Sequence, residues 1–134
     1  MNWINMVGAA ILASTLASFT DWYFFGVLFH NRYNATPGAW KKYADKKDEI
    51  RSISISTLLQ SITSVVFVGA CAYLQIVTLI PTLCAAFVVW LMLPLPLLIS
   101  QSLFLRVHRL IVVSHSLGWL ARLLVTALCV SWLL

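Results

Sequence analysis

Acidic side chains are scarce in this sequence. It contains four Asp and Glu residues against nine Lys and Arg residues, and charged residues make up only 10% of the chain, whereas hydrophobic residues make up 61%. This balance excludes an ordinary soluble domain, in which about a quarter of the residues are charged. With 134 residues, the chain has the length of one domain, 1–134, and leaves no room for a second folded unit beside a membrane part.

Motifs for catalysis and cofactor binding are also lacking. The three cysteines form no CxxC pair and the three histidines form no closely spaced pair, so neither a redox motif nor a zinc motif is present. Basic and aromatic residues do not interleave over a wide surface as they do in nucleic-acid-binding domains. We therefore expect a protein that is not an enzyme, holds no metal or other cofactor and binds no nucleic acid. A haem ligated through His115 is the alternative.

The sequence is dominated by four long apolar runs, at about 3–29, 53–74, 80–105 and 110–134. At a rise of about 1.5 Å per residue, a helix over each run crosses a hydrocarbon core of about 30 Å. The first run lacks the basic start of a signal peptide and exceeds the length of its apolar core, so we expect a retained span. The predicted fold class is all-α, a polytopic membrane four-helix bundle.

Eight of the nine basic residues fall in the two connections 30–52 and 106–109, and the opposite side of the predicted bundle carries none. The positive-inside rule therefore places both connections in the cytoplasm and both termini outside the inner (plasma) membrane. This bias argues against antiparallel dimers. The eight residues are expected to face anionic lipid headgroups: Arg32, Lys41, Lys42, Lys46, Lys47, Arg51, Arg106 and Arg109.

Prolines mark two local features of the chain. Thr36 and Pro37 are typical of the N-cap and the first residue of a helix. The residues from Ala39 onward then form either an interfacial helix on the membrane surface or an extension of the second span. In the third run, Pro94 and Pro96 each remove a backbone donor, so the sequence predicts a kink in the middle of the membrane.

Part of the sequence is similar to a known family. Asp21-Trp22, the segment Gly26-Val27-Leu28-Phe29-His30, Tyr33 and a tryptophan ten residues after His30 resemble a group of small bacterial four-helix inner-membrane proteins. That group is catalogued only as a domain of unknown function (number seventeen sixty-one). The last fifty residues, with a polar turn between two apolar spans and Gly118 early in the last one, are similar as well. The resemblance implies the same fold and a bacterial inner membrane, and it implies no reaction.

Five of the polar residues inside the predicted spans fall at neighbouring depths. Counted from the cytoplasmic boundaries, Asp21, Gln60, Gln101 and His115 fall in the inner half of the membrane and Arg122 lies deeper. Because an unpaired charge in hydrocarbon is unfavourable, we expect Asp21 and Arg122 to form an ion pair inside the bundle. The cluster is then either a lock on helix register or a proton-coupled transport site in which Asp21 titrates. The absence of a second acid to relay protons favours the lock.

Small and polar residues predict how the helices pack. Ala10, Ser14 and Ser18 in the first span, and Ser114 and Gly118 in the last, repeat every four residues and allow close helix approach. The first half of the second span is rich in hydroxyl and amide groups, so we expect this half of the span to be buried in the bundle. Its polar residues are Ser54, Ser56, Thr57, Gln60, Ser61, Thr63 and Ser64.

Cys71 and Cys84 flank the second connection near the predicted outer boundary, and Cys129 falls at a similar depth. An oxidising periplasm would permit a disulfide between the first two. Ordinary small apolar cysteines are the favoured interpretation.

Two functions of different classes fit the sequence. The favoured one is a small integral membrane protein without a catalytic site, acting as an oligomer or as an accessory subunit of a membrane complex. The lack of catalytic motifs and the small-residue faces support it. The alternative is a small transporter or channel, built as a parallel oligomer, with a polar intramembrane site around Asp21 and Arg122.

Overall fold

The computed structural model describes residues 3–36, 45–105 and 107–134, and all regular secondary structure in these ranges is helical. The elements are α1 (Trp3–Asp21), the π-helix η1 (Trp22–Leu28), α2 (His30–Ala35), α3 (Lys46–Tyr73), α4 (Leu79–Met92), α5 (Pro94–Phe104) and α6 (Arg109–Leu133). They form units long and apolar enough to cross a membrane, at Trp3–Leu28, Lys46–Tyr73, Leu79–Phe104 and Arg109–Leu133. The predicted all-α four-helix membrane fold is confirmed. The second unit begins at Lys46, earlier than the predicted span.

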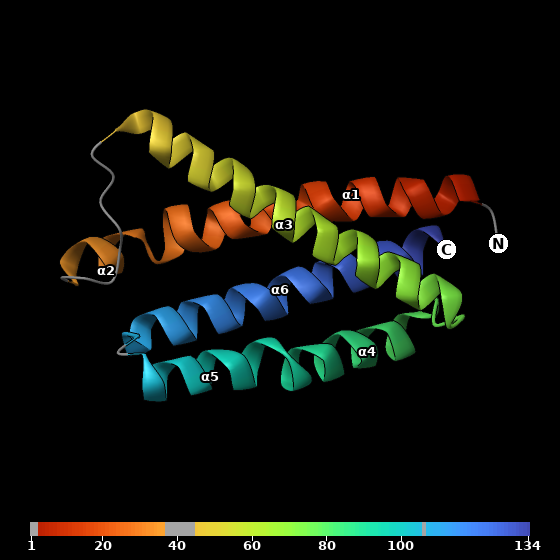
Figure 1. Cartoon of the computed structure of the whole chain (residues 1–134). Coiled ribbons are helices and arrows are strands. Elements are labelled where there is room, and N and C mark those ends of the chain that lie inside the picture. The colour runs from red at the N-terminus through yellow and green to blue at the C-terminus, as the bar shows by residue number, and fades with distance from the viewer. Residues whose placement is uncertain (1–2, 37–44, 106) are drawn as a thin grey trace.

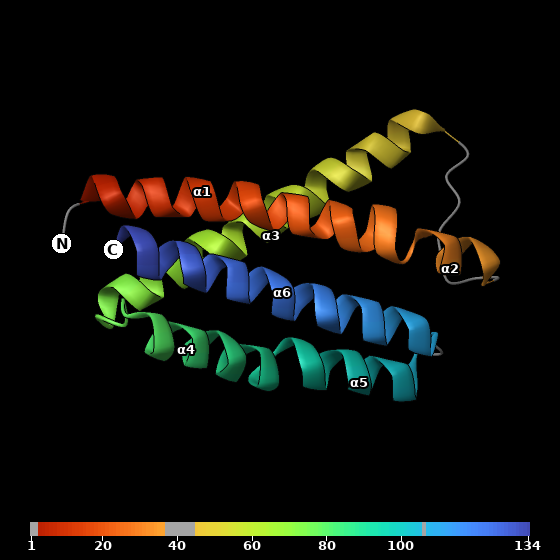
Figure 2. The same cartoon turned by 180° about the vertical axis from the view of Figure 1, so that it is seen from behind.

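The last helix, α6, lies at the centre of the bundle. It packs against α1 along its length, against α4 and α5 on another side, and against α3 over a shorter stretch; α1 also packs against α3 (Figures 1 and 2). The beginning of α1 and the end of α6 lie together at one end of the molecule (Figures 1 and 2). The end of α2, the beginning of α3 and the α5–α6 turn lie at the other end (Figures 1 and 2).

The buried face of α1 is shifted by one residue from the predicted one. Ala9, Ala13 and Ala17 are 0–1% exposed, whereas the predicted row of Ala10, Ser14 and Ser18 is only half-buried. The Ser18 hydroxyl donates to the Ser14 carbonyl (2.9 Å), so Ser18 satisfies its hydroxyl without another helix. Two adjacent rows share the four-residue spacing, and the spacing cannot tell them apart.

The small-residue row predicted on α6 does lie in the interior. Ser114 is fully buried and Gly118 is buried too. The same four-residue spacing continues this row through Arg122, Thr126 and Val130, each at most 2% exposed. Rows of residues four apart are the ridges that interlock when two helices pack closely, and α1 carries the matching row that ends at Asp21.

A widened helical turn follows Asp21, where α1 changes into η1. The Phe29 amide donates to the Phe24 carbonyl five residues back (2.9 Å), which is the hydrogen bond of a π-turn. The extra residue rotates the chain that follows. Phe29 and Tyr33 are thereby buried against Phe24 and Phe25 and against the first turn of α6.

The predicted kink in the third span is present. α4 ends at Met92, Leu93 adopts φ −118° and ψ −74°, and α5 begins with the buried Pro94. Without an amide hydrogen, Pro94 cannot continue the hydrogen-bond ladder of α4. The ladder resumes when the Leu97 amide donates to the Leu93 carbonyl (3.2 Å).

The first half of α3 is not buried, in contrast to the prediction. Ser54 and Ser56 are exposed, Thr57, Gln60, Ser61 and Thr63 are half-buried, and Ser64 alone of the predicted set is fully buried. In Figure 1 this half of α3 diverges from α1 and α6. Each of four hydroxyls donates to the carbonyl four residues earlier, so α3 needs no neighbour to satisfy them: those of Ser54, Thr57, Ser61 and Thr63.

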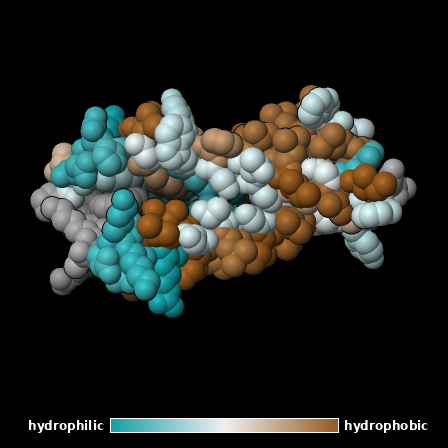
Figure 3. Space-filling view, turned by 90° about the horizontal axis from the view of Figure 1, so that it is seen from above, coloured by the Kyte–Doolittle hydropathy of each residue, from teal (hydrophilic) through white to brown (hydrophobic). Residues whose placement is uncertain are grey.

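Charged side chains gather at the end of the molecule where α2 ends and α3 begins (Figure 3). The described members of the headgroup-facing set are all exposed: Arg32, Lys46, Lys47, Arg51 and Arg109. Asp45 caps α3 by accepting from the Lys47 amide (3.0 Å). The predicted helix beginning at Pro37, and the residues Lys41, Lys42 and Arg106, lie outside the described residues.

The three cysteines are free. Cys71 and Cys129 are buried in the main core together with Ala9 and Ala13 of α1, Phe67, Val68 and Val130. Cys84 is exposed on α4. Two of the three thus act as small apolar core residues.

Candidate intramembrane polar site

An ion pair between Asp21 and Arg122 lies near the middle of the bundle. Arg122 Nη2 donates to Asp21 Oδ1, and the two side chains are 3% and 10% exposed. Asp21 is the last residue of α1, at the end of its alanine row, and Arg122 follows Gly118 on the matching row of α6. Close approach of these small-residue rows therefore brings the two charges together.

Gln60 on α3 connects a third helix to the ion pair of Asp21 and Arg122. With its amide oriented to suit its neighbours, the side-chain nitrogen donates to Asp21 Oδ2. Its oxygen then accepts from Arg122 Nη2 (3.2 Å) and from the Ser56 hydroxyl (3.1 Å). Both carboxylate oxygens of Asp21 consequently have a donor. The cluster of Asp21, Gln60 and Arg122, called the polar cluster below, joins α1, α3 and α6.

Arg122 is only partly satisfied within this cluster. The indole ring of Trp119 lies over its guanidinium group, with Cζ 4.6 Å from the ring centroid, which is the geometry of a cation–π contact. Among the residues that the structure describes, Nε and Nη1 of Arg122 have no hydrogen-bond acceptor, although both are buried. Both carboxylate oxygens of Asp21 thus accept hydrogen bonds, whereas two of the three guanidinium nitrogens of Arg122 donate none to a described residue.

Hydroxyl contacts extend this polar layer along α6. Toward the chain ends, the Thr126 hydroxyl donates to the Arg122 carbonyl (2.9 Å) and lies 3.5 Å from the hydroxyl of Ser64 on α3. Toward the opposite end, the Tyr33 hydroxyl is hydrogen-bonded to Ser114 Oγ. Burial raises the pKa of the Tyr33 phenol above its ordinary value. Tyr33 therefore remains neutral and ties α2 to α6.

The structure leaves two of the five predicted polar residues outside the cluster. His115 is half-buried and its ring lies against that of Phe25, with centroids 4.6 Å apart. Gln101 is half-buried on α5, and its side chain makes no hydrogen bond to another described residue. Counting residues along a helix predicts depth but not the direction in which a side chain points, so equal depth did not bring these residues together.

The remaining histidines have local structural contacts. His30 is hydrogen-bonded to Asn34 (3.0 Å) on α2, and His108 Nδ1 accepts from the Leu110 amide (3.1 Å) at the beginning of α6. Within the described ranges, no three His, Cys, Asp or Glu side chains lie close enough together to hold a metal ion.

Sequence reasoning missed several members of this site. Trp119 precedes Arg122 by three residues and Ser56 precedes Gln60 by four, so helical spacing alone could have placed each beside its partner. Tyr33 had no such signal, because its contact with Ser114 depends on the π-turn. Gly118 has a steric role as well: a Cβ at this position would lie 3.3 Å from the ring of Phe25.

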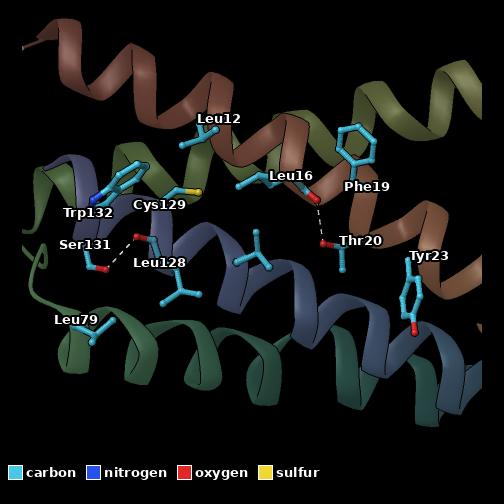
Figure 4. Close-up of a pocket in the computed structure, with 11 residues that line it drawn as sticks. Leu12, Leu16, Phe19, Thr20, Tyr23, Leu79, Leu128, Cys129, Ser131 and Trp132 are labelled. Carbon is cyan, nitrogen blue, oxygen red and sulfur yellow. Dashed lines mark hydrogen bonds between the residues drawn. The ribbon is translucent and has the colours of Figure 1, made fainter.

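Two apolar grooves open on the surface of the bundle. The first, of about 870 Å³, lies between α1, α6 and the beginning of α4 (Figure 4). Two of its hydroxyl groups are bonded to their own helices, that of Thr20 to the Leu16 carbonyl and that of Ser131 to the Leu128 carbonyl. The second, of about 560 Å³, lies at the α4–α5 break and has Trp119 in its wall.

The arrangement has the properties of a helix lock. Its two charges cancel, both oxygens of the acid accept hydrogen bonds, and three helices contribute one side chain each. A buried charge pair of this kind strongly disfavours any shift that would separate its members.

The chain was also compared with known proteins. A family model described as a protein of unknown function (DUF1761) matches residues 8–131. No curated protein and no solved structure matches the chain.

Proposed function

The chain belongs to the DUF1761 family of proteins of unknown function, and we propose that it is a non-catalytic membrane subunit that works in an assembly. The assembly is a homo-oligomer or a larger membrane complex. In this proposal the protein resides in the inner membrane, with both termini outside. Its exposed basic residues then face anionic headgroups on the cytoplasmic side.

The exposed half of α3 carries this proposal. Between residues 50 and 63 this helix presents bulky apolar side chains that are about half or more exposed, among them Ile53 at 58%, Leu58 at 62% and Leu59 at 60%. Ser54 and Ser56 are exposed between them. Mixed apolar and hydroxyl surfaces are typical of helix–helix contacts in membranes, where hydroxyls can bond across the interface. We call the exposed side chains of α3 between residues 50 and 62 the assembly face.

Cross-linking in native membranes tests the assembly face. On a background without the natural cysteines, Leu58→Cys is treated with a bifunctional maleimide, and Leu103→Cys serves as the control. Leu103 is 74% exposed and lies in the last turn of α5. We expect cross-linked products from Leu58→Cys and none from Leu103→Cys. A dimer of the chain identifies a homo-oligomer, and a constant second protein identifies an accessory subunit. Monomer alone from both variants contradicts the proposal.

Transport is the second candidate function. It is favoured by one observation, the charge pair of Asp21 and Arg122 in the middle of the bundle, because ionisable groups at this depth often mark ion pathways. Asp21→Asn distinguishes the two roles. If the chain transports an ion, this variant keeps its assembled mass in mild detergent and loses flux in proteoliposomes. If the pair is a lock, the assembled mass itself is lost.

A further inference from the structure

The first half of α3 separates from the rest of the bundle at the polar cluster. There the Gln60 amide contacts Asp21, the last residue of α1. From this contact two paths of the chain run to the end of the molecule where α2 ends and α3 begins. One path is η1 with α2 and the other is the first half of α3 (Figures 1 and 2). α3 packs on α1 and on α6, but it has at most marginal contact with η1 or α2.

Exposure along one side of α3 shows that the space between these paths is open. Ser64 faces α6 and is 1% exposed, and the residues on the same side of α3 precede it at intervals of three or four. Gln60 and Thr57 are half-buried, whereas Ile53 is 58% exposed and Ile50 is 55% exposed. Side chains that point toward the bundle thus become exposed toward the beginning of α3. We call the space between residues 46–60 of α3 and the η1–α2 path the lateral opening.

Lys46 begins the same side of α3. It precedes Ser64 by five turns of an ideal helix, and it is exposed. From Lys46 to Thr57 the helix rises by about 16 Å, which is about half of the hydrocarbon core. The α3 wall of the lateral opening therefore has the depth of one leaflet. It carries a positive charge at the open end, isoleucines at the depth of an acyl chain and Gln60 at the closed end.

Basic side chains outnumber acidic ones at this end of the molecule (Figure 3). The described acids there are Asp45, Asp48 and Glu49, and the described basic residues are Arg32, Lys46, Lys47, Arg51 and Arg109. None of these residues forms an ion pair within the described ranges, where Asp21 and Arg122 form the one pair. The excess positive charge attracts an anion. Because Lys46 lies beside an apolar wall, the anion that fits best also carries acyl chains.

We propose that the lateral opening binds one anionic phospholipid. Its phosphate pairs with Lys46 in the positive field of Arg32 on α2, and an acyl chain lies along Ile50 and Ile53. A zwitterionic phospholipid offers the same acyl chains but no net negative charge, so the headgroup decides the selection. The proposal rests on the proposed function only in its membrane orientation, with this end of the molecule at anionic headgroups.

The lipid site does not rest on the assembly face. The two share Ile50 and Ile53, whereas Leu58 and Leu59 of the assembly face lie on other sides of the helix. Cross-linking through Leu58→Cys is therefore expected whether or not the lipid binds. Failure of the lipid site and failure of the assembly remain distinguishable.

Native mass spectrometry of the full chain released from lipid nanodiscs tests the binding. The nanodiscs contain equal amounts of palmitoyl-oleoyl phosphatidylglycerol, which is anionic, and of the phosphatidylcholine with the same acyl chains. We expect one phosphatidylglycerol retained per chain, with a preference of about fivefold or more over phosphatidylcholine. Equal retention of the two lipids overturns the proposal, as does the absence of a retained lipid.

A pair of charge variants on α3 locates the phosphate. Lys46→Gln removes the cation at the mouth of the lateral opening, and Arg51→Gln removes one about 140° further round the same helix. We expect Lys46→Gln to lower the retention of phosphatidylglycerol about fivefold and Arg51→Gln to leave it nearly unchanged. Equal losses in both variants would indicate a general attraction of anionic lipid to this end, and would overturn the proposal.

A matched pair of bulky variants tests the apolar wall. Ile53→Trp fills the lateral opening, whereas Ile55→Trp adds the same bulk about 200° further round the helix. The two positions are 58% and 49% exposed, so neither substitution disturbs the core. We expect Ile53→Trp to abolish the phosphatidylglycerol adduct and Ile55→Trp to retain it. The reverse pattern, or loss in both variants, overturns the proposal. A dimer of the chain that Ile53→Trp dissociates, without a lipid adduct, identifies a second copy as the occupant and overturns it too.

Discussion

The centre of the bundle and the first half of α3 are both rich in polar side chains, yet the hydrogen bonds of these side chains differ. At the centre, Asp21, Gln60 and Arg122 bond between helices. On α3, the hydroxyls of Ser54 and Thr57 bond to carbonyls of their own helix. A charge or an amide needs several partners and must find them on other helices. A single hydroxyl is satisfied one turn back. Polar content alone therefore does not predict burial in this protein.

The largest effect is expected from breaking the central pair. Arg122→Ala leaves Asp21 without its main partner inside the bundle, so we expect a loss of about 3–5 kcal/mol in the free energy of unfolding. Titration with SDS in mild detergent, followed by circular dichroism, measures this quantity. The double variant Asp21→Leu/Arg122→Met removes both charges and is expected to stay within about 1–2 kcal/mol of wild type. A single variant as stable as the double one would show that the pair does not lock the helices.

A smaller effect is expected from crowding the face of α1 that packs on the other helices. Ala13 is 0% exposed, so Ala13→Leu should overpack the contact and lower the free energy of unfolding by about 1–3 kcal/mol. Its neighbour Ser14 belongs to the half-buried row, and Ser14→Leu should change stability by less than about 0.5 kcal/mol. The same SDS titration compares the two. A larger effect at Ser14 would mean that the row of Ala10, Ser14 and Ser18 forms the interface after all.

Removing the hydrogen bond between Tyr33 and Ser114 tests the polar contacts near the beginning of α6. Tyr33→Phe should lower the free energy of unfolding by about 1 kcal/mol at neutral pH. Because burial raises the pKa of the folded phenol above its ordinary value of 10.0, its contribution is fully present below pH 10.0 and is lost as the pH rises through the folded pKa. Stability measured from pH 8 to 11 should therefore fall more steeply in wild type than in Tyr33→Phe. Parallel curves would exclude this contribution.

The smallest effect is expected from removing single hydroxyl groups of α3. One of them faces another helix and the other bonds to its own helix. Ser64 is buried and its hydroxyl faces that of Thr126 on α6, so Ser64→Ala should destabilise the bundle by about 0.6 kcal/mol. Ser54 is exposed and bonds to Ile50 of its own helix. Ser54→Ala should leave the free energy of unfolding of the isolated chain unchanged. Equal losses in both variants would remove the distinction between the two regions.

Much of the site could be predicted by counting residues along each predicted span. The depth of Asp21 and of Arg122 follows from counting residues, and the unfavourable energy of an isolated charge makes each the natural partner of the other. Gln60 was expected at the same depth as Asp21. The donor geometry that connects it to both charges, and the stacking of Trp119 on Arg122, depend on the rotation of each helix about its axis. Depth contains no information on that rotation, and for this reason Gln101 and His115 were grouped with a cluster that they do not join.

The number of spans, their approximate ends and the break at Pro94 were readable from the amino-acid order. Hydrophobic length and the missing proline donor act locally and need no partner to be recognised. The buried face of α1, the exposure of the first half of α3 and the position of Tyr33 depended on how the helices meet. In each case, contacts within one helix compete with contacts between helices. Side chains that are distant in sequence, such as Ala13 on α1 and Gly118 on α6, decide which contacts form.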